Sequence, residues 1–319
     1  MQNPIISIAI LSHNHESFIE RAINGVLSQK CNYSFELLLF DDASSDSTQD
    51  IINRFAEKYP EIISKHCYSE SLGPIVRAKQ IFENCKGKYI TWLDGDDYWT
   101  YHSKLQIQLD FLEANPQYSG CFHDAIISNT SMKNNTETNL ISNQSLHKYR
   151  YYSQFNHYEI EFSPYLLLLR NIIPTASLVF RKYDFSEFFE KYNLEIYSFS
   201  WAFQLHLISY GNFKFFNRCW SVYRDHNEGL SKKISSEKFT LNNISILKYF
   251  KKYAFYKNHI NTIHESIARE YECMIRDKDK NNIVFKYMTN YLWQSFLLLF
   301  KNGLYYKKQY ILQFFIHKK

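Results

Sequence analysis

The sequence predicts an α/β protein in which a Rossmann-like, mostly parallel sheet has helices on both faces and is followed by a C-terminal helical region. Two observations support this prediction. Apolar, β-rich runs alternate with segments of helical periodicity through the N-terminal half, and such alternation is typical of right-handed βαβ units. From Ser236 onward the pattern is helical alone, and no proline follows Pro174.

The predicted strands are short apolar runs, several of which end in polar or acidic residues. In chain order they are Ile5–Leu11, Phe35–Phe40, Ile62–Tyr68, Lys88–Leu93, Tyr118–Ile127 and Ala176–Phe180, followed by a strand pair around Phe213–Tyr223. Continuous apolar runs of this kind are typical of strands that a parallel sheet buries on both faces.

The predicted helices separate these strands. They cover Ser17–Gln29, Ser47–Lys58, Pro74–Asn84, Lys104–Glu113 and Trp201–Ser209. In the first of them, apolar residues recur at the spacing of a helix. Ser45 or Asp46 is expected to cap the second. The stretch Ser128–Ser145 is rich in Asn, Ser and Thr and predicts a loop.

The composition bounds the class of protein. The chain has 319 residues, of which 45% are hydrophobic and 22% charged, and this excludes collagen-like and wholly disordered proteins. Its six cysteines show no C-x-x-C pair, which favours the reduced thiols of a cytoplasmic protein. No signal peptide is expected, and no apolar run reaches the roughly 18 residues of a spanning helix.

Charge is distributed unevenly along the chain. Residues 230–319 hold 17 Lys and Arg against 6 Asp and Glu, whereas residues 1–229 hold 20 against 26. We therefore expect two domains, residues 1–230 and 231–319. The basic, aromatic-rich C-terminal region is typical of helices on an anionic membrane surface, but also of a helical subdomain with solvated lysines. Nucleic acid is not expected as a partner, because no known reader motif is present and the N-terminal part is acidic.

The sharpest motif is the acidic turn Asp94-Gly95-Asp96-Asp97. Three carboxylates within four residues repel one another, and a cation is needed to keep them ionised together. Mg²⁺ or Mn²⁺ suits such oxygen ligands and would bridge to a diphosphate. The alternative is a solvated acidic turn, although its place directly after a buried strand favours function.

Two further polar clusters follow predicted strands. Asp41 and Asp42 end the second strand, where they can accept hydrogen bonds from a ribose or a base, or cap the following helix. Ser12 and Asn14 follow the first strand. Ligands of parallel sheets bind outside the carboxyl ends of the strands, so all three clusters are expected to face one crevice.

These motifs together resemble the family 2 glycosyltransferases, and in particular a bacterial surface-polysaccharide subgroup. The matching segments are Ile5–Asn14, Phe40–Thr48, Gly87–Trp99, Lys104–Gln106, Asp110–Glu113, Asn115–Pro116, Cys121–His123, Thr175–Arg181 and Tyr223–His226. The resemblance covers roughly residues 4–230 with the motifs in order, which is specific for the family and says little about the sugar.

The resemblance implies a GT-A fold and an inverting transfer of a sugar from a nucleotide-sugar donor, with Mn²⁺ or Mg²⁺ as cofactor. The expected donor is a UDP-hexose or UDP-N-acetylhexosamine. The expected acceptor is a glycan or lipid-linked glycan in surface polysaccharide synthesis, at the inner face of the cytoplasmic membrane. A catalytically silent glycan-binding or scaffolding member of a synthesis complex is the alternative.

Site residues carry over one by one. Asp42, with Asp41, resembles the carboxylate that contacts the nucleoside, and Asp94 and Asp96 resemble the D-x-D pair. The expected metal ligands are Asp96, Asp97 and His226, although His226 is also interpretable as an ordinary loop histidine. The remaining residues expected to bind the nucleotide sugar are Ser12, Asn14, Arg77 and Arg224. For both arginines the alternative is a surface position.

The sequence departs from the family at the catalytic base. The family's spacing, counted back from Gly211, places Ser200 where relatives carry an acidic residue. Serine does not accept a proton near neutral pH, so Glu195 is the nearest candidate base; a shifted register or lost activity are the other interpretations. Trp201 is expected to line the acceptor pocket, or to be a core residue.

Overall fold

The computed structural model describes residues 4–129, 150–153, 162–191, 197–226, 229, 234–276 and 292–294. The chain forms two compact units. The first comprises Met1–Ser163 and Ile172–Gly229, and the second comprises Pro164–Asn171 and Leu230–Lys319. The division after Gly229 falls one residue before the predicted domain boundary. The sequence pattern did not predict that residues 164–171 belong with the C-terminal region.

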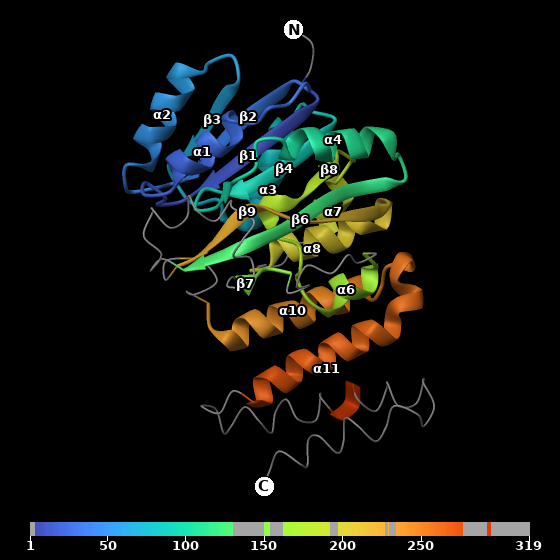
Figure 1. The fold of residues 1–319 in the computed structure, drawn as a ribbon. Coiled ribbons are helices and arrows are strands. Elements are labelled where there is room, and N and C mark those ends of the chain that lie inside the picture. The colour runs from blue at the N-terminus through green and yellow to red at the C-terminus, as the bar shows by residue number, and fades with distance from the viewer. Residues whose placement is uncertain are drawn as a thin grey trace. The chain divides into compact units, whose positions relative to one another are not determined.

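The N-terminal half of the first unit is a parallel sheet (Figure 1). Its strands are β1 (Ile6–Ser12), β2 (Phe35–Asp42), β3 (Ile63–Tyr68) and β4 (Tyr89–Asp94). β1 lies at the centre, with β2 and β4 as parallel neighbours, and β3 pairs in parallel with β2. Every residue of β1 is buried, as expected for a strand covered on both faces.

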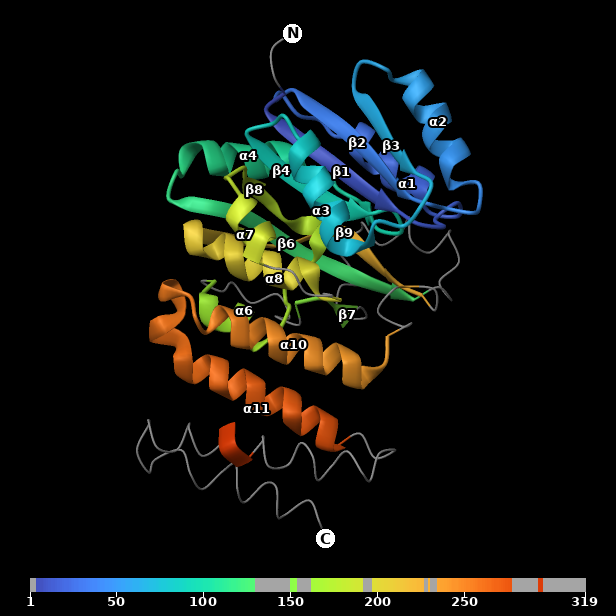
Figure 2. The ribbon, with the colours of Figure 1, turned by 180° about the vertical axis from the view of Figure 1, so that it is seen from behind.

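Helices cover both faces of this sheet (Figures 1 and 2). On one face, α1 (Ile19–Leu27), α2 (Thr48–Lys58) and α4 (Lys104–Ala114) share an apolar core with β1 and β2. On the other lies α3 (Gly73–Asn84), with α7 (Ser186–Lys191) and α8 (Phe199–Leu207). Phe82 of α3 connects this second layer to the sheet. Its ring centroid lies 5.0 Å from that of Phe203 in α8 and 5.9 Å from that of Trp92 in β4.

Beyond β4 the sheet becomes mixed. The nine strands found among the described residues run in the order β3-β2-β1-β4-β8-β6-β9-β5, and β7 pairs with β6. The added strands are β5 (Tyr98–Trp99), β6 (Tyr118–Asn129), β7 (Arg150–Tyr151), β8 (Val179–Arg181) and β9 (Asn212–Asp225). β6 and β9 are parallel, whereas the other added pairs are antiparallel. The sheet is therefore mixed: all pairs from β3 to β4 are parallel, as is the β6–β9 pair, and the remaining pairs are antiparallel.

Two predicted elements differ from the structure. The strand pair expected around Phe213–Tyr223 is the single strand β9, whose register with β6 shifts at irregularities near Asp124. The strand expected from Ala176 begins later, because Thr175–Ser177 forms a 3₁₀ turn before β8. Residues 130–149, most of the predicted loop, lie outside the described residues.

The second unit is helical where it is described. It contains α6 (Pro164–Leu169), α10 (Ser236–Phe250) and α11 (Ile260–Arg276), with a 3₁₀ segment at Ala254–His259. Ser235 caps α10 by accepting a hydrogen bond from the backbone N–H of Lys238. In the part of the chain that the structure describes, none of the helices has both the length and the apolar character needed to cross a membrane.

Candidate active site

The polar clusters predicted from the sequence collect at the C-terminal ends of strands. β1 ends at Ser12, β2 at Asp42, β4 at Asp94 and β9 at Asp225. Because β1, β2 and β4 are parallel neighbours, their ends share one edge of the sheet. Contacts described below join the end of β9 to the turn after β4.

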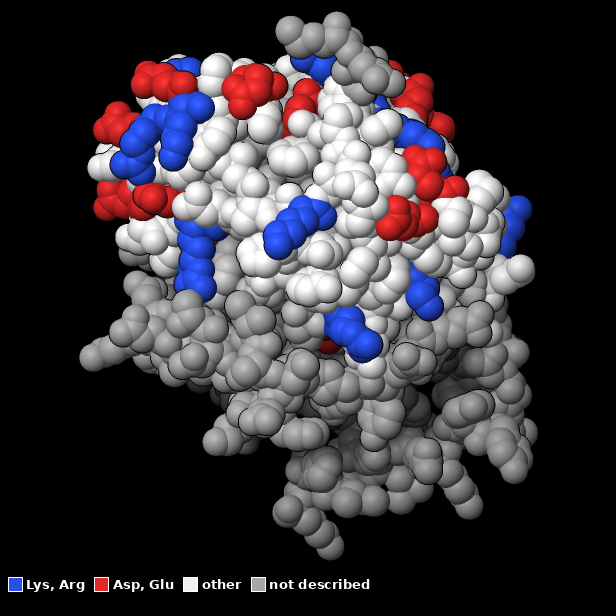
Figure 3. Space-filling view, turned by 45° about the horizontal axis from the view of Figure 1, so that its top comes forward, with Lys and Arg blue, Asp and Glu red and all other residues white. Residues whose placement is uncertain are grey.

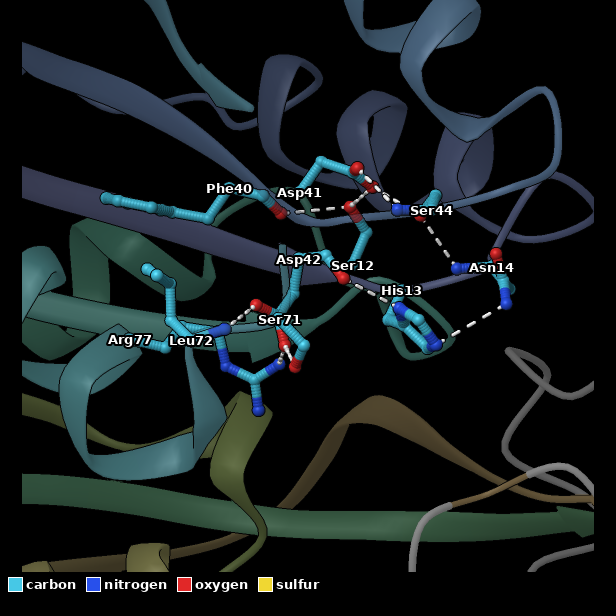
Figure 4. A network of polar contacts seen from close by, with 10 residues as sticks. All are labelled: Ser12, His13, Asn14, Phe40, Asp41, Asp42, Ser44, Ser71, Leu72 and Arg77. Atoms are coloured by element: carbon cyan, nitrogen blue, oxygen red, sulfur yellow. Dashed lines mark hydrogen bonds and ion pairs between the residues drawn. The ribbon is translucent and has the colours of Figure 1, made fainter. Parts of the chain in front are cut away.

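Asp41 shapes the turn that follows β2 (Figure 4). It accepts hydrogen bonds from the hydroxyl of Ser12 at 3.1 Å, the backbone N–H of Ser44 at 3.0 Å and the amide of Gln49 at 2.7 Å. Ala43, inside this turn, has a φ of 59°, which L-residues rarely adopt. The carboxylate of Asp41 makes these hydrogen bonds within the protein, and Asp41 therefore holds the turn in place.

Asn14 connects the turn after β1 to the turn after β2. Its backbone N–H donates to the hydroxyl of Ser44 at 2.8 Å, and its side-chain oxygen accepts from the N–H of Ser45 at 2.8 Å. With a φ of 56°, Asn14 occupies the left-handed region, which asparagine tolerates better than most residues. Ser12 and Asn14 thus fix the two turns against each other.

Asp42 faces α3 rather than the turn (Figure 4). Its carboxylate accepts hydrogen bonds from the N–H of Leu72 at 2.8 Å and the hydroxyl of Ser71 at 2.9 Å, and pairs with Arg77 at 3.0 Å. The side chains of Asp42 and Arg77 are 5% and 19% exposed. Arg77 is therefore a largely buried partner of Asp42 and not part of a solvated helix face.

The turn after β4 is tightly packed. The backbone N–H of Gly95 donates to the carbonyl of Leu11 at 2.6 Å, and that of Asp97 to the carbonyl of Asp94 at 3.0 Å. A Cβ on residue 95 would lie 2.9 Å from both His15 Nδ1 and Ile19 Cδ1. A larger residue at this position would therefore force the side chains of His15 and Ile19 to move away from the turn.

Residues from the end of β9 complete this turn. His226 Nε2 lies 2.8 Å from Oδ2 of Asp96. Arg224 donates its backbone N–H to Oδ1 of Asp97 at 3.0 Å and its guanidinium to the backbone carbonyl of Asp96 at 2.5 Å. The same guanidinium stacks 4.5 Å from the ring centroid of Tyr98. Residues 94–97 and 224–226 therefore form one cluster.

The three carboxylates of the turn have different proton affinities. Burial, with the charge of Asp96, raises the pKa of Asp94 to about 7. Burial and the charges of Asp96 and Asp94 raise the pKa of Asp97 well above its usual value. Burial acts on Asp96 in the same direction, but the hydrogen bond from His226 and the charge of His15 outweigh it, so the pKa of Asp96 is lowered.

The cluster fits a divalent cation by its charge and ligand types. It offers carboxylate oxygens and one imidazole nitrogen, which Mn²⁺ accepts. Burial, followed by the repulsion of neighbouring carboxylates, raises the pKa values of Asp94 and Asp97, and a bound cation would favour their ionised forms. Among the described residues, no three His, Cys, Asp or Glu side chains already converge as ligands. Asp96 and His226, which contact each other, would be the first to hold the ion.

His15 lies beside this cluster but was not singled out from the sequence. Its Nε2 lies 3.9 Å from Oδ2 of Asp96, and its buried Nδ1 has no hydrogen-bond partner among the described residues. The backbone N–H of His15 donates to the hydroxyl of Thr48 at 2.8 Å, which fixes the residue in place. Its position directly after Asn14 was the available signal.

Of the three residues considered for the base and the acceptor, the structure describes Ser200 and Trp201. Ser200 is half-buried in the first turn of α8. Trp201 is 2% exposed, which favours the interpretation of a core residue over that of an acceptor wall. Glu195 lies outside the described residues.

The fold is similar to solved glycosyltransferase structures. A structure of S. aureus TarS in complex with UDP-GlcNAc matches with a TM-score of 0.61 and 14% identity, covering 91% of this chain and 81% of that one. The mannosyltransferase PcManGT from Pyrobaculum calidifontis, in complex with GDP-Man and Mn²⁺, matches with a TM-score of 0.56 and 12% identity, covering 93% and 86%. The expected GT-A fold is confirmed.

Relatives at the level of sequence cover shorter stretches. An uncharacterised Mycobacterium tuberculosis protein is 26% identical over 70% of this chain, which spans 60% of that relative's length. TuaG of Bacillus subtilis, a glycosyltransferase assigned to teichuronic acid biosynthesis, is 34% identical over 34% of this chain and 42% of its own. The Escherichia coli UDP-Glc:α-D-GlcNAc-diphosphoundecaprenol β-1,3-glucosyltransferase WfaP is 33% identical over 34% and 41%.

A family model identifies the family of this chain. The model described as Glycosyl transferase family 2 matches residues 7–184, more than half of the chain. This stretch includes the ends of β1, β2 and β4, where the polar clusters lie. The expected family is therefore confirmed, and the chain belongs to glycosyl transferase family 2.

Proposed function

We propose that this family 2 chain is an inverting glycosyltransferase. It moves a hexose or N-acetylhexosamine from a UDP-sugar to a glycan or lipid-linked glycan acceptor in surface polysaccharide synthesis. One observation carries the proposal: the D-x-D turn meets Arg224 and His226 at the same sheet edge that holds the Asp42–Arg77 pair. A nucleotide and a diphosphate can lie along such an edge.

Separate groups of residues contact the nucleoside and the diphosphate of the donor. Asp42, positioned by Arg77, faces the nucleoside, while Ser12, Asn14 and Asp41 hold the two turns that border it. Asp96, Asp97 and His226 would hold a divalent cation, Asp94 would contact the nucleotide sugar beside it, and Arg224 adds a fixed positive charge. When bound, the cation stabilises charge on the departing diphosphate.

The similar proteins support the choice of donor and acceptor. TarS is seen with UDP-GlcNAc, and WfaP uses UDP-Glc with a diphosphoundecaprenol-linked acceptor. TuaG is assigned to the synthesis of a cell-surface polymer, teichuronic acid. A manganese ion accompanies the donor in PcManGT, which supports Mn²⁺ as the cofactor.

We further propose that the C-terminal unit holds the enzyme on the anionic inner face of the cytoplasmic membrane. Described residues of this unit include the exposed lysines Lys248, Lys252 and Lys257 and the 40% exposed Phe255. Lysines beside an exposed aromatic ring suit an anionic interface. On the face in Figure 3, by contrast, the described residues carry acidic and basic side chains interspersed.

Donor and acceptor panels test the function. UDP-, GDP- and dTDP-sugars are offered with Mn²⁺ and diphosphoundecaprenol-linked sugars, and the anomeric configuration of any product is read by NMR. We expect transfer from a UDP-sugar with inversion. Retention would contradict the mechanism. Binding of UDP-sugars without transfer to any acceptor would favour the silent, glycan-binding alternative, which the serine at position 200 motivates.

The base is tested separately. If Glu195 accepts the proton of the acceptor hydroxyl, Glu195→Gln lowers the transfer rate by roughly 10²–10⁴-fold and leaves donor affinity unchanged. Ser200→Asp places a carboxylate where relatives carry one and should not cripple transfer. Full transfer by Glu195→Gln would show that another group is the base.

A further inference from the structure

We propose that Tyr152 forms the sugar side of the donor site, with its ring and hydroxyl contacting the sugar that the diphosphate carries. This inference rests on the proposed function and deepens it, because it separates recognition of the sugar from recognition of the nucleotide. Tyr152 lies outside the segments through which the sequence resembles the family.

The backbone on both sides of Tyr152 is fixed. Its own N–H donates to the carbonyl of Ala125 at 3.0 Å, continuing the ladder between β7 and β6. The next residue, Ser153, is fully buried and donates its N–H to Asp124 at 3.0 Å, and its hydroxyl to the other oxygen of the same carboxylate. Asp124 is 5% exposed, so this anchor lies in the interior.

Tyr151, before Tyr152, packs with apolar side chains on one face of the sheet. It is 7% exposed and belongs to a cluster of buried side chains from neighbouring strands, whose other members are Tyr98, Ile126 and Val222. These residues are paired across β5, β9, β6 and β7, since Tyr98 is opposite Val222, and Ile126 is opposite both Val222 and Tyr151.

Tyr223 follows Val222 within β9 and stands on the opposite face of the sheet from this cluster, because side chains alternate along a strand. Tyr152 comes directly after β7, which ends at Tyr151, and Asp97 directly before β5, which begins at Tyr98. The rings of Tyr152 and Tyr223 are in edge contact, with centroids 5.3 Å apart. Asp97 accepts a hydrogen bond from Arg224, directly after Tyr223. The two tyrosines therefore border the D-x-D turn.

The surroundings of Tyr152 agree with this position. Burial, the neighbouring Tyr223 and the carboxylates of Asp97 and Asp94 raise the pKa of Tyr152, which keeps its phenol neutral. The side chain is only half-buried, so part of it borders open space. Its hydroxyl can exchange hydrogen bonds with the hydroxyls of a sugar.

The strand order shows which part of the donor reaches Tyr152. β2, which carries Asp42, and β1 lie on one side of β4, whereas β6, β9 and β7 lie on the other. A donor whose nucleoside faces Asp42 and whose diphosphate lies at the turn after β4 extends its sugar toward β7 and β9. Tyr152 and Tyr223 stand on that side.

Affinities for UDP and for UDP-sugars separate the two kinds of recognition. Kd values for UDP, UDP-glucose and UDP-GlcNAc are measured by titration calorimetry with Mn²⁺ for wild type, Tyr152→Phe and Tyr152→Ala. We expect Tyr152→Ala to bind UDP within about twofold of wild type and the preferred UDP-sugar about 5- to 10-fold more weakly, the usual value of one hydrogen bond or ring contact. Tyr152→Phe should lose only the part of the UDP-sugar affinity that the hydroxyl contributes.

Tyr101→Ala is the matched control, because Tyr101 is 41% exposed and stacks on Trp220 away from the turn. It should leave all three affinities unchanged. Equal losses for UDP and UDP-sugar in the Tyr152 variants, or no loss in either, would overturn the inference. If Tyr152→Ala does not fold, the ratio of the two affinities in Tyr152→Phe decides. A wild-type protein that binds neither UDP nor a UDP-sugar refutes the proposed function itself.

Discussion

His226 Nε2 lies 2.8 Å from Oδ2 of Asp96, although the two residues are 130 positions apart in the sequence. The contact brings the end of β9, among the last residues of the first unit, to the turn after β4. Arg224 reinforces it through hydrogen bonds to Asp96 and Asp97. The diphosphate end of the proposed donor site is therefore assembled from β4 and β9, which β8 and β6 separate in the sheet.

Asp94 makes stability depend on pH. Its pKa is about 7 in the folded protein and 3.8 in an ordinary aspartate, so between these values the folded state holds a proton that the unfolded state has released. The free energy of unfolding therefore falls as pH rises from about 4 to about 7. Asp94→Asn lacks this titration.

In EDTA, we expect the melting temperature of wild type to fall relative to that of Asp94→Asn as the pH rises from 5 to 8. Asp50→Asn, at an exposed position of α2, should follow wild type. Parallel curves for wild type and Asp94→Asn would show that Asp94 ionises normally.

Arg77 stabilises the fold by pairing with a buried charge. Arg77→Ala leaves the 5% exposed carboxylate of Asp42 without its cation, so we expect the free energy of unfolding to fall by about 2 kcal/mol. The exposed pair of Arg54 and Glu20 is the matched control, since Arg54→Ala should cost under about 1 kcal/mol. Urea denaturation measures both. Similar losses would mean that burial does not strengthen the Asp42 pair.

Lys104 is expected to destabilise the protein near neutral pH. It is fully buried, its ammonium has no hydrogen-bond partner in the described structure, and burial lowers its pKa to about 7 from 10.5. The folded state therefore gains stability as pH rises from about 7 to about 10. Contact with the Trp99 ring, 3.9 Å from the ammonium, offsets part of the cost.

Lys104→Met keeps an unbranched side chain of similar length and removes its charge. We expect it to melt above wild type at pH 7, with the difference shrinking toward pH 10. A variant that melts lower at pH 7 would show that the cation–π contact outweighs burial.

The acidic clusters were predictable because they are local. Each follows a continuous apolar run, and the ends of parallel strands share an edge, so Asp42 and Asp94 were expected in one crevice. The pairing of Arg77 with Asp42 was not, because it depends on how α3 packs across 35 positions of the sequence. Nor was the position of Tyr152, which depends on an anchor between Ser153 and Asp124.

Strand pairing limited the rest of the prediction. β9 was expected as two strands, because the polar Asn217 and Arg218 interrupt its apolar residues. In the structure it continues beside β6 through register shifts, and thereby carries Arg224 to the acidic turn. The partners of Asp96 were suggested only by the resemblance to a family, since no local pattern relates residues this far apart.

The C-terminal unit is expected to bind anionic vesicles. Co-sedimentation should rise with the fraction of anionic lipid and fall with salt, because counter-ions screen surface charge. Replacing Lys248, Lys252 and Lys257 by Glu should reduce it. The same change at the exposed Lys58, Lys65 and Lys86 of the first unit is the matched control and should have less effect. Equal binding to neutral vesicles would rule out an electrostatic anchor.

The most direct test of the central claim is calorimetric titration of UDP-glucose and UDP-GlcNAc, with Mn²⁺, into wild type, Asp96→Ala and His226→Ala. Wild type is predicted to bind at least one UDP-sugar, and each variant to bind it at least about 10-fold more weakly with its fold intact, as expected for lost metal-site residues. Asp50→Ala should bind like wild type. Unchanged affinity in both Asp96→Ala and His226→Ala, or no binding by wild type, would contradict the assignment of this cluster to the donor.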